Sequence, residues 1–253
     1  MKYIDHLKEL RKRILLSFFV LIVSFCIFLY YASFVGEILS KPLFDLFDDS
    51  DKKRMIFTAL PEVFVSNLKI ALFAAFLTSF PFLISQVVLF IYPALYKKEK
   101  KIFIPTFFLI PVLFICGIVF AYFFLIPIIW DFFLSFENFL QGSVPVELES
   151  KYSEYMKLTM YLLFASGLSF EFPILLFVLS KVGIIDYETL KTKRKYFFIG
   201  IIVFSAIFTP PDVISQIGIA IPLIIFYEFS ILLIKLTKKS YYEIIRFCNS
   251  KNI

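Results

Sequence analysis

Long apolar runs constrain this chain more than any other feature of its sequence. Hydrophobic residues occupy 60% of its 253 positions, and 36 residues are phenylalanine. Because a soluble domain of this length cannot bury so much apolar surface, the bilayer must be the solvent for most side chains. A helix that crosses the hydrocarbon core needs about 20 apolar residues. Spans are expected at about 14–35, 64–95, 102–130, 155–182, 196–208 and 213–235.

These runs predict an all-α integral membrane protein with six transmembrane helices in a single polytopic domain, residues 1–253. The fifth span, 196–208, is short, since at 1.5 Å per residue it reaches about 20 Å across a core of about 30 Å. A short span leaves a recess that a partner helix or a substrate could occupy. A kink is expected in the fourth span because Pro173 lacks an N–H, and Gly167 permits another helix to approach closely.

Lysine and arginine are distributed unequally between the two sides that six spans create. The side with both termini holds 19 of the 26, in the N-terminal segment, the second–third and fourth–fifth connections and the tail. The positive-inside rule therefore places both termini in the cytoplasm. The remaining seven fall on the outer side: Lys41, Lys52, Lys53, Arg54, Lys69, Lys151 and Lys157.

Two isolated carboxylates occur among the cytoplasmic bases. Residues 3–13 have apolar side chains at helical spacing and predict an amphipathic helix at the membrane interface, in which Glu9 could simply pair with Lys12 or Arg13 for about 0.2–0.5 kcal/mol. Glu99 lies among four lysines and could be an ordinary solvated residue. Carboxylates also match the planar fork of arginine, which donates two parallel hydrogen bonds. The spacing alone leaves both interpretations open.

The position of Glu171 is harder to explain by ordinary surface pairing or solvation than the positions of Glu9 and Glu99. It lies near the middle of the fourth span, where an ionisable side chain costs roughly 2.5–3.5 kcal/mol and is usually functional. Either it is protonated, or it pairs inside the bundle, with Gln86 or Gln216 as possible partners, or it pairs with another chain. Glu228 is nearer the interface and is expected to reach the headgroups or to pair with Lys235.

Several classes of function are disfavoured. The single histidine, His6, excludes bis-histidine haem ligation and multi-histidine metal sites within the chain, and no Walker-type glycine loop is present. No span carries the paired aspartates of an intramembrane protease. The basic residues are concentrated on one side of the membrane, as the topology of a membrane protein explains, so they do not indicate nucleic-acid binding. We therefore expect no catalytic site, metal or cofactor.

The main alternative function is secondary transport of a small solute. Glu171 would then be a proton-relay carboxylate, and the short fifth span would mark the binding site. Neither a second intramembrane acid at comparable depth nor an internal repeat is evident in the sequence.

Four segments, taken together and in order, closely resemble the TatC family. They are His6–Arg13, Pro93–Lys101, Ser169–Pro173 and Phe208–Gln216. That family is the multispanning receptor subunit of the twin-arginine protein translocase, and the similarity extends from Ile4 to about Leu236 with the same plan of six spans.

The resemblance implies specific roles for the isolated polar residues. Glu9 and Glu99, with Arg11 and Phe90, would bind twin-arginine signal peptides at the cytoplasmic face. Glu171 and Gln216 would contact TatA- and TatB-type single-span proteins within the membrane. Three further residues match positions that the family treats as functionally sensitive: Pro42, Gln86 and Asp212. By itself, Asp212 is more simply a cap at the start of the sixth helix.

The resemblance also implies how the protein works and where. It would be a non-enzymatic receptor in the bacterial cytoplasmic (inner) membrane that exports folded cargo using the proton-motive force. Its partners would include membrane lipid and other copies of itself, but neither nucleic acid nor a cofactor.

Overall fold

The computed structural model is helical and divides into two compact units, residues 1–167 and 168–253. The described backbone covers residues 2–46, 55–91, 97–139, 150–181, 183–209 and 213–250. Side chains are described for residues 6–46, 55–90, 105, 107–135, 150–181, 183–209 and 213–236.

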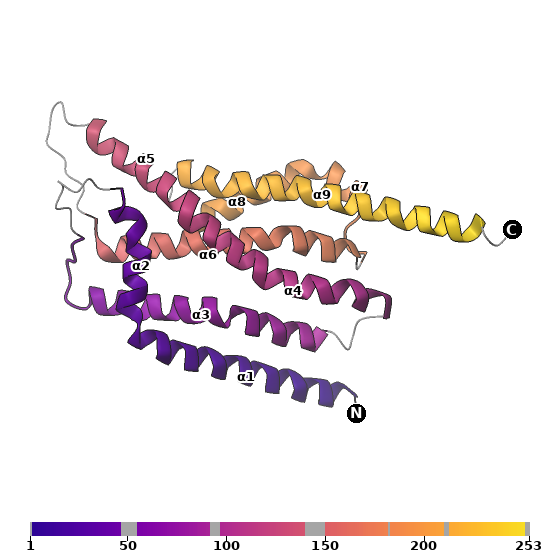
Figure 1. The fold of residues 1–253 in the computed structure, drawn as a ribbon, viewed down its shortest axis with the longest axis horizontal. Coiled ribbons are helices and arrows are strands. Elements are labelled where there is room, and N and C mark those ends of the chain that lie inside the picture. The colour runs from indigo at the N-terminus through magenta and orange to yellow at the C-terminus, as the bar shows by residue number, and fades with distance from the viewer. Residues whose placement is uncertain are drawn as a thin grey trace. The chain divides into compact units, whose positions relative to one another are not determined.

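In its described residues, the first unit contains five α-helices and the first part of α6. A π-helical turn, Ala121–Leu125, joins α4 to α5, so that these two helices form one continuous rod (Figure 1). The helices are α1 (Lys2–Tyr30), α2 (Ala32–Phe44), α3 (Glu62–Ile91), α4 (Lys97–Phe120), α5 (Ile126–Phe139) and α6 (Tyr152–Lys181).

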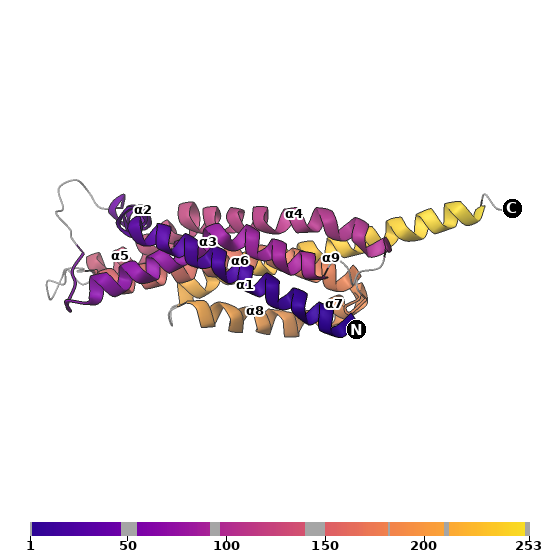
Figure 2. The same cartoon turned by 90° about the horizontal axis from the view of Figure 1, so that it is seen from below.

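The N-terminal segment is continuous with the first long helix, and its expected position at the membrane interface stays a prediction. Residues 3–13 belong to α1, which continues without a break to Tyr30 and packs alongside α3 (Figures 1 and 2). Helix α1 ends before residue 35, where the first span was expected to end, because the chain turns at Tyr31 and enters α2, which runs steeply across the direction of α1 (Figure 1). The apolar run continues past this turn since α2 buries one face in the first unit.

Pro42 lies inside α2, and its effect on the helix is compensated. Proline has no N–H, so the Ile38 carbonyl loses its usual donor four residues later. The Tyr122 hydroxyl, from the π-helical turn, donates to that carbonyl at 2.8 Å. The Tyr155 hydroxyl of α6 likewise donates to the Leu39 carbonyl at 2.8 Å. Hydroxyl groups from the π-helical turn and from α6 thus hold α2 at the turn that contains the buried Pro42.

The segments that precede α3 and α6 are bound to each other. The Ile56 N–H donates to the Ser150 carbonyl, and the Tyr152 N–H donates to the Ile56 carbonyl, both at 3.0 Å. We call residues 56–62 and 150–153 the loop clasp. It holds the N-termini of two helices together although they begin 90 residues apart in the sequence.

Glu62, the first residue of α3, is the centre of this clasp. Its Oε2 accepts hydrogen bonds from the backbone N–H of Thr58 at 2.9 Å and of Ala59 at 3.3 Å. Its Oε1 accepts from the Ser153 hydroxyl at 2.6 Å, and Lys151 Nζ lies 4.0 Å from Oε2. One carboxylate thus satisfies donors on both segments.

Replacing Glu62 by alanine is expected to loosen the clasp without unfolding the helices, because the donors on both segments lose their acceptor. Hydrogen exchange at the Thr58 and Ala59 amides should become faster on the order of ten-fold, as measured by mass spectrometry. Glu37→Ala, which removes an exposed acid from α2, is the control and should leave these rates unchanged. Unchanged exchange in the Glu62 variant would contradict this account.

The second unit contains the remainder of α6 and three further helices, α7 (Tyr187–Thr192), α8 (Arg194–Phe208) and α9 (Val213–Ser250). The fully buried Tyr227 of α9 donates its hydroxyl proton to the Leu190 carbonyl at 2.7 Å and stacks on Phe197. The expected pairing of Glu228 with Lys235 is wrong. Glu228 accepts a hydrogen bond from Arg194 at 2.9 Å, because α8 and α9 pack together.

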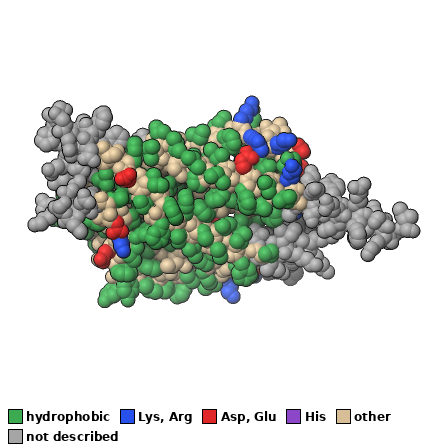
Figure 3. All heavy atoms as spheres, turned by 45° about the horizontal axis from the view of Figure 1, so that its top comes forward, with side chains coloured by type: hydrophobic (Ala, Val, Ile, Leu, Met, Phe, Trp, Pro, Cys, Tyr) green, Lys and Arg blue, Asp and Glu red, His purple; other side chains and the backbone are tan. Residues whose placement is uncertain are grey.

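Within the described residues, five helical stretches are long and apolar enough to cross a membrane: His6–Tyr30, Glu62–Phe90, Phe107–Ser135, Tyr152–Lys181 and Val213–Leu236. Hydrophobic side chains cover most of the described part of the face in Figure 3, as a lipid environment requires. The protein is therefore a multi-pass membrane protein. Helix α8, with 15 residues, is shorter than these five. Pro173 lies within α6, and the kink there stays a prediction.

Candidate functional site

Glu9 lies on α1 with a guanidinium already bound to it. Arg13 donates to Glu9 Oε1 from Nη2 at 2.6 Å and from Nε at 3.1 Å. This is the i,i+4 pair that the sequence allowed as the ordinary interpretation. Both donors meet the same carboxylate oxygen, whereas Oε2 lies 3.9 Å from His6 Nδ1. The Glu9 side chain keeps 37% of its surface exposed.

Helix α3 adds two of the predicted residues to this cluster. Gln86 Oε1 accepts a hydrogen bond from Arg13 Nη1 at 3.3 Å, and the Phe90 ring stacks on His6 with 4.4 Å between centroids. Gln86, Phe90 and Arg13 also line a groove of about 460 Å³ whose other lining residues are mainly apolar. The structure therefore brings Glu9, Gln86 and Phe90 together.

Of the other predicted residues, the structure describes the side chain of Arg11 but not those of Glu99 and Asp212. Arg11 is exposed on α1. Glu99 lies in the first turn of α4, but its side chain is outside the described residues, as is all of Asp212.

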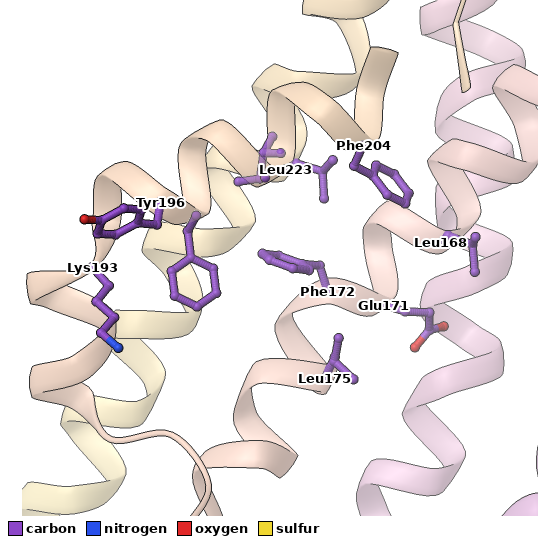
Figure 4. Close-up of a pocket in the computed structure, with 11 residues that line it drawn as sticks. Leu168, Glu171, Phe172, Leu175, Lys193, Tyr196, Phe204 and Leu223 are labelled. Atoms are coloured by element: carbon purple, nitrogen blue, oxygen red, sulfur yellow. The ribbon is translucent and has the colours of Figure 1, made fainter. Parts of the chain in front are cut away.

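Glu171 is half-buried on α6 and lines a hollow of about 640 Å³ in the second unit. The other lining is apolar except near one end, where Lys193 and Tyr196 lie, while Glu171 and Leu168 lie toward the other end (Figure 4). A carboxylate and an ammonium group are thus the charged groups among the lining residues of this hollow.

Gln216 of α9 forms a hydrogen bond with α8. Its Nε2 donates to the Ile202 carbonyl at 3.3 Å. The two amides considered as partners of Glu171 thus form hydrogen bonds elsewhere: Gln86 with Arg13, and Gln216 with the Ile202 carbonyl.

The sequence profile of the family described as "Sec-independent protein translocase protein (TatC)" matches residues 5–222. The chain belongs to the TatC family. A TatC protein of Rickettsia prowazekii is 38% identical over 229 residues, 90% of each chain. That of Aquifex aeolicus is 36% identical over 240 residues, 95% of this chain and 97% of the relative.

The same family is found among solved structures. A crystal structure described as the twin arginine translocase receptor TatC has a TM-score of 0.78 and 36% identity, covering 92% of this chain and 99% of that one. The resemblance inferred from four segments is confirmed. TatC family members are components of a protein translocase rather than enzymes, and this favours translocation over the small-solute transporter alternative.

Sequence reasoning missed Lys193 and Tyr196 as lining residues of the hollow beside Glu171. A signal for them exists along α8, where Phe197, Gly200 and Phe204, together with Lys193 just before the helix, recur at spacings of three and four residues. The stacking of His6 on Phe90 had no such signal, because it depends on how α1 packs against α3.

Proposed function

We propose that this TatC family member is the core receptor of a twin-arginine translocase and binds the twin-arginine signal peptides of folded cargo at its cytoplasmic face. The observation that carries the proposal is a family match over residues 5–222 that includes Glu9, a carboxylate with a guanidinium bound to it. A second carboxylate, Glu99, at the start of α4, would accept the second arginine of the peptide.

The geometry around Glu9 supports this role. Arg13 donates to Oε1 from Nε and Nη2, so Oε2 can accept a hydrogen bond from an incoming arginine without loss of the internal pair. The groove beside Gln86 and Phe90 would take apolar residues that follow the arginines, because signal peptides carry an apolar region after their charged one.

The membrane topology in this proposal has six spans, with α8 as the fifth and both termini in the cytoplasm. Its 15 residues extend about 22 Å, so the bilayer must thin there or neighbouring helices must cover its ends. The distribution of 19 of the 26 lysines and arginines on the terminal side supports this orientation. The sources of the relatives favour a bacterial cytoplasmic membrane.

Within the membrane, Glu171 and Gln216 would contact TatA- and TatB-type single-span subunits. Assembly with these subunits and with other copies of the chain would couple peptide binding to export driven by the proton-motive force. The apolar hollow beside Glu171 supports this role, since a helix seated there would bring its own polar residue to the carboxylate.

The test is binding of a fluorescent signal peptide to the purified full chain in detergent. Glu9→Ala and Glu99→Ala should each weaken binding of a peptide with Arg-Arg by about ten-fold or more, because each removes a charge-assisted hydrogen bond. The same substitutions should hardly change binding of the matched Lys-Lys peptide, which lacks the planar fork.

Glu188→Ala is the matched control, since it removes an exposed acid from α7, on the same side of the proposed topology. It should leave both affinities unchanged. Equal binding of the Arg-Arg peptide to the wild type and to the Glu9/Glu99 double variant would overturn the receptor proposal.

A further inference from the structure

Two lysines of the first unit line one groove in an otherwise apolar surface. Lys69 of α3 and Lys157 of α6 are both exposed, and with Leu21 of α1 they border a groove of about 550 Å³. Most of the remaining lining is aromatic or aliphatic, including Phe73 and Tyr161. Neither lysine takes part in the signal-peptide site or in the hollow beside Glu171.

The two lysines lie near the same ends of their helices. Lys69 follows the start of α3 by seven residues and Lys157 follows the start of α6 by five. The loop clasp holds these two helix starts together. In the proposed topology these ends face the outer side, where long lysine side chains extend toward the lipid headgroups.

No ion pair within the protein accounts for these charges among the described residues. Lys157 Nζ lies 5.7 Å from the centroid of the Tyr161 ring. Glu62, at the same helix ends, accepts hydrogen bonds from Thr58 and Ser153 and lies near Lys151. Two ammonium groups beside an apolar groove in a bilayer therefore call for an anion from outside the chain.

We propose that this groove binds one anionic phospholipid, with its phosphate between Lys69 and Lys157 and an acyl chain along the apolar lining. The two lysines give charge complementarity to a phosphodiester, and the aromatic walls match a hydrocarbon chain. A soluble phosphate ion would satisfy the lysines but leave the apolar walls uncovered. The lipid is therefore the occupant that satisfies the two lysines and also covers the apolar lining of the groove.

The experiment is native mass spectrometry of the full chain in detergent with equal amounts of phosphatidylglycerol and phosphatidylcholine that carry the same acyl chains. Phosphatidylglycerol should be retained preferentially. Lys69→Gln and Lys157→Gln should each reduce its retention about five-fold, as expected for a lysine near an anionic headgroup. Lys69→Arg and Lys157→Arg keep the charge and should retain the preference.

Two further variants separate the charge from the groove. Lys41→Gln removes an exposed lysine from the last turn of α2, away from the groove lining, and should have no effect. Leu72→Trp fills the groove while keeping both lysines and should weaken retention of both lipids. Thermal unfolding of each variant checks that the fold is intact.

Three results would overturn the proposal. They are equal retention of the two lipids by the wild type, unchanged preference in the Lys69/Lys157 double glutamine variant, and displacement of phosphatidylglycerol by millimolar inorganic phosphate.

Discussion

Replacing Glu171 by alanine is expected to reduce export of a folded twin-arginine reporter protein by at least about ten-fold. Ionisable side chains within a membrane span are rare and usually functional, and a partner helix that carries a polar group would gain a charge-assisted contact at this carboxylate. Glu171 borders a hollow that is otherwise apolar apart from its Lys193 and Tyr196 end. Loss of the carboxylate removes the polar contact that we propose for the partner.

Signal-peptide binding should distinguish this effect from general damage. Glu171 is not among the residues of the Glu9 cluster or of the groove beside it, so peptide affinity in the Glu171→Ala variant should stay within about two-fold of wild type. Glutamine keeps a polar group of the same size and should preserve part of the export activity. Export is measured in cells that lack their own copy of the protein.

Glu154→Ala is the matched control, because Glu154 is an exposed acid in the first turn of the same helix. It should export normally. Normal export by the Glu171→Ala variant would contradict the docking role. Site-specific crosslinking from α6 that captures no single-span partner would also count against it.

Apolar runs predicted the long helices because a bilayer leaves few other structures available to them. They could not predict where α1 gives way to α2, since hydropathy does not record direction and the apolar run continues past Tyr31 to residue 35. The reason that Pro42 is tolerated there is a hydroxyl from Tyr122, 84 residues from the Ile38 carbonyl that it satisfies. Such compensation is visible only after folding.

The candidate site shows the same division between local and distant contacts. The pairing of Glu9 with Arg13 follows from helical spacing, and the sequence predicted it as one of two interpretations. The contacts of Gln86 with Arg13 and of Phe90 with His6 come from the packing of α1 on α3. Glu228 shows the limit most clearly, because the nearby Lys235 suggested one partner and the neighbouring helix supplied another, Arg194.

Gly167→Leu is expected to have the largest effect on stability. A Cβ at this position would lie 2.8 Å from a ring carbon of Phe114, well inside contact distance. That ring is fully buried and stacks on Phe80 with 3.7 Å between centroids, so it has little room to move. Beside it, the Ser166 hydroxyl donates to the Gly117 carbonyl at 2.8 Å, as expected where small residues let two membrane helices approach closely.

Even Gly167→Ala should lower the free energy of unfolding by about 1–3 kcal/mol, the usual cost of overpacking a tightly filled interior, and leucine should cost more. Thermal unfolding of the full chain in detergent measures the change. Gly200→Ala is the matched control, since nothing lies within 4 Å of a Cβ built there. In that variant, the better helix propensity of alanine should leave stability unchanged or slightly higher.

The cause of the destabilisation can be tested separately from its size. Phe114→Leu creates space in front of Gly167, so the Gly167→Ala substitution should cost less in the Phe114→Leu background than alone. A double-mutant cycle measures this difference as an interaction energy between the two positions. Strict additivity of the two substitutions would show that Gly167 matters for some reason other than its contact with the Phe114 ring.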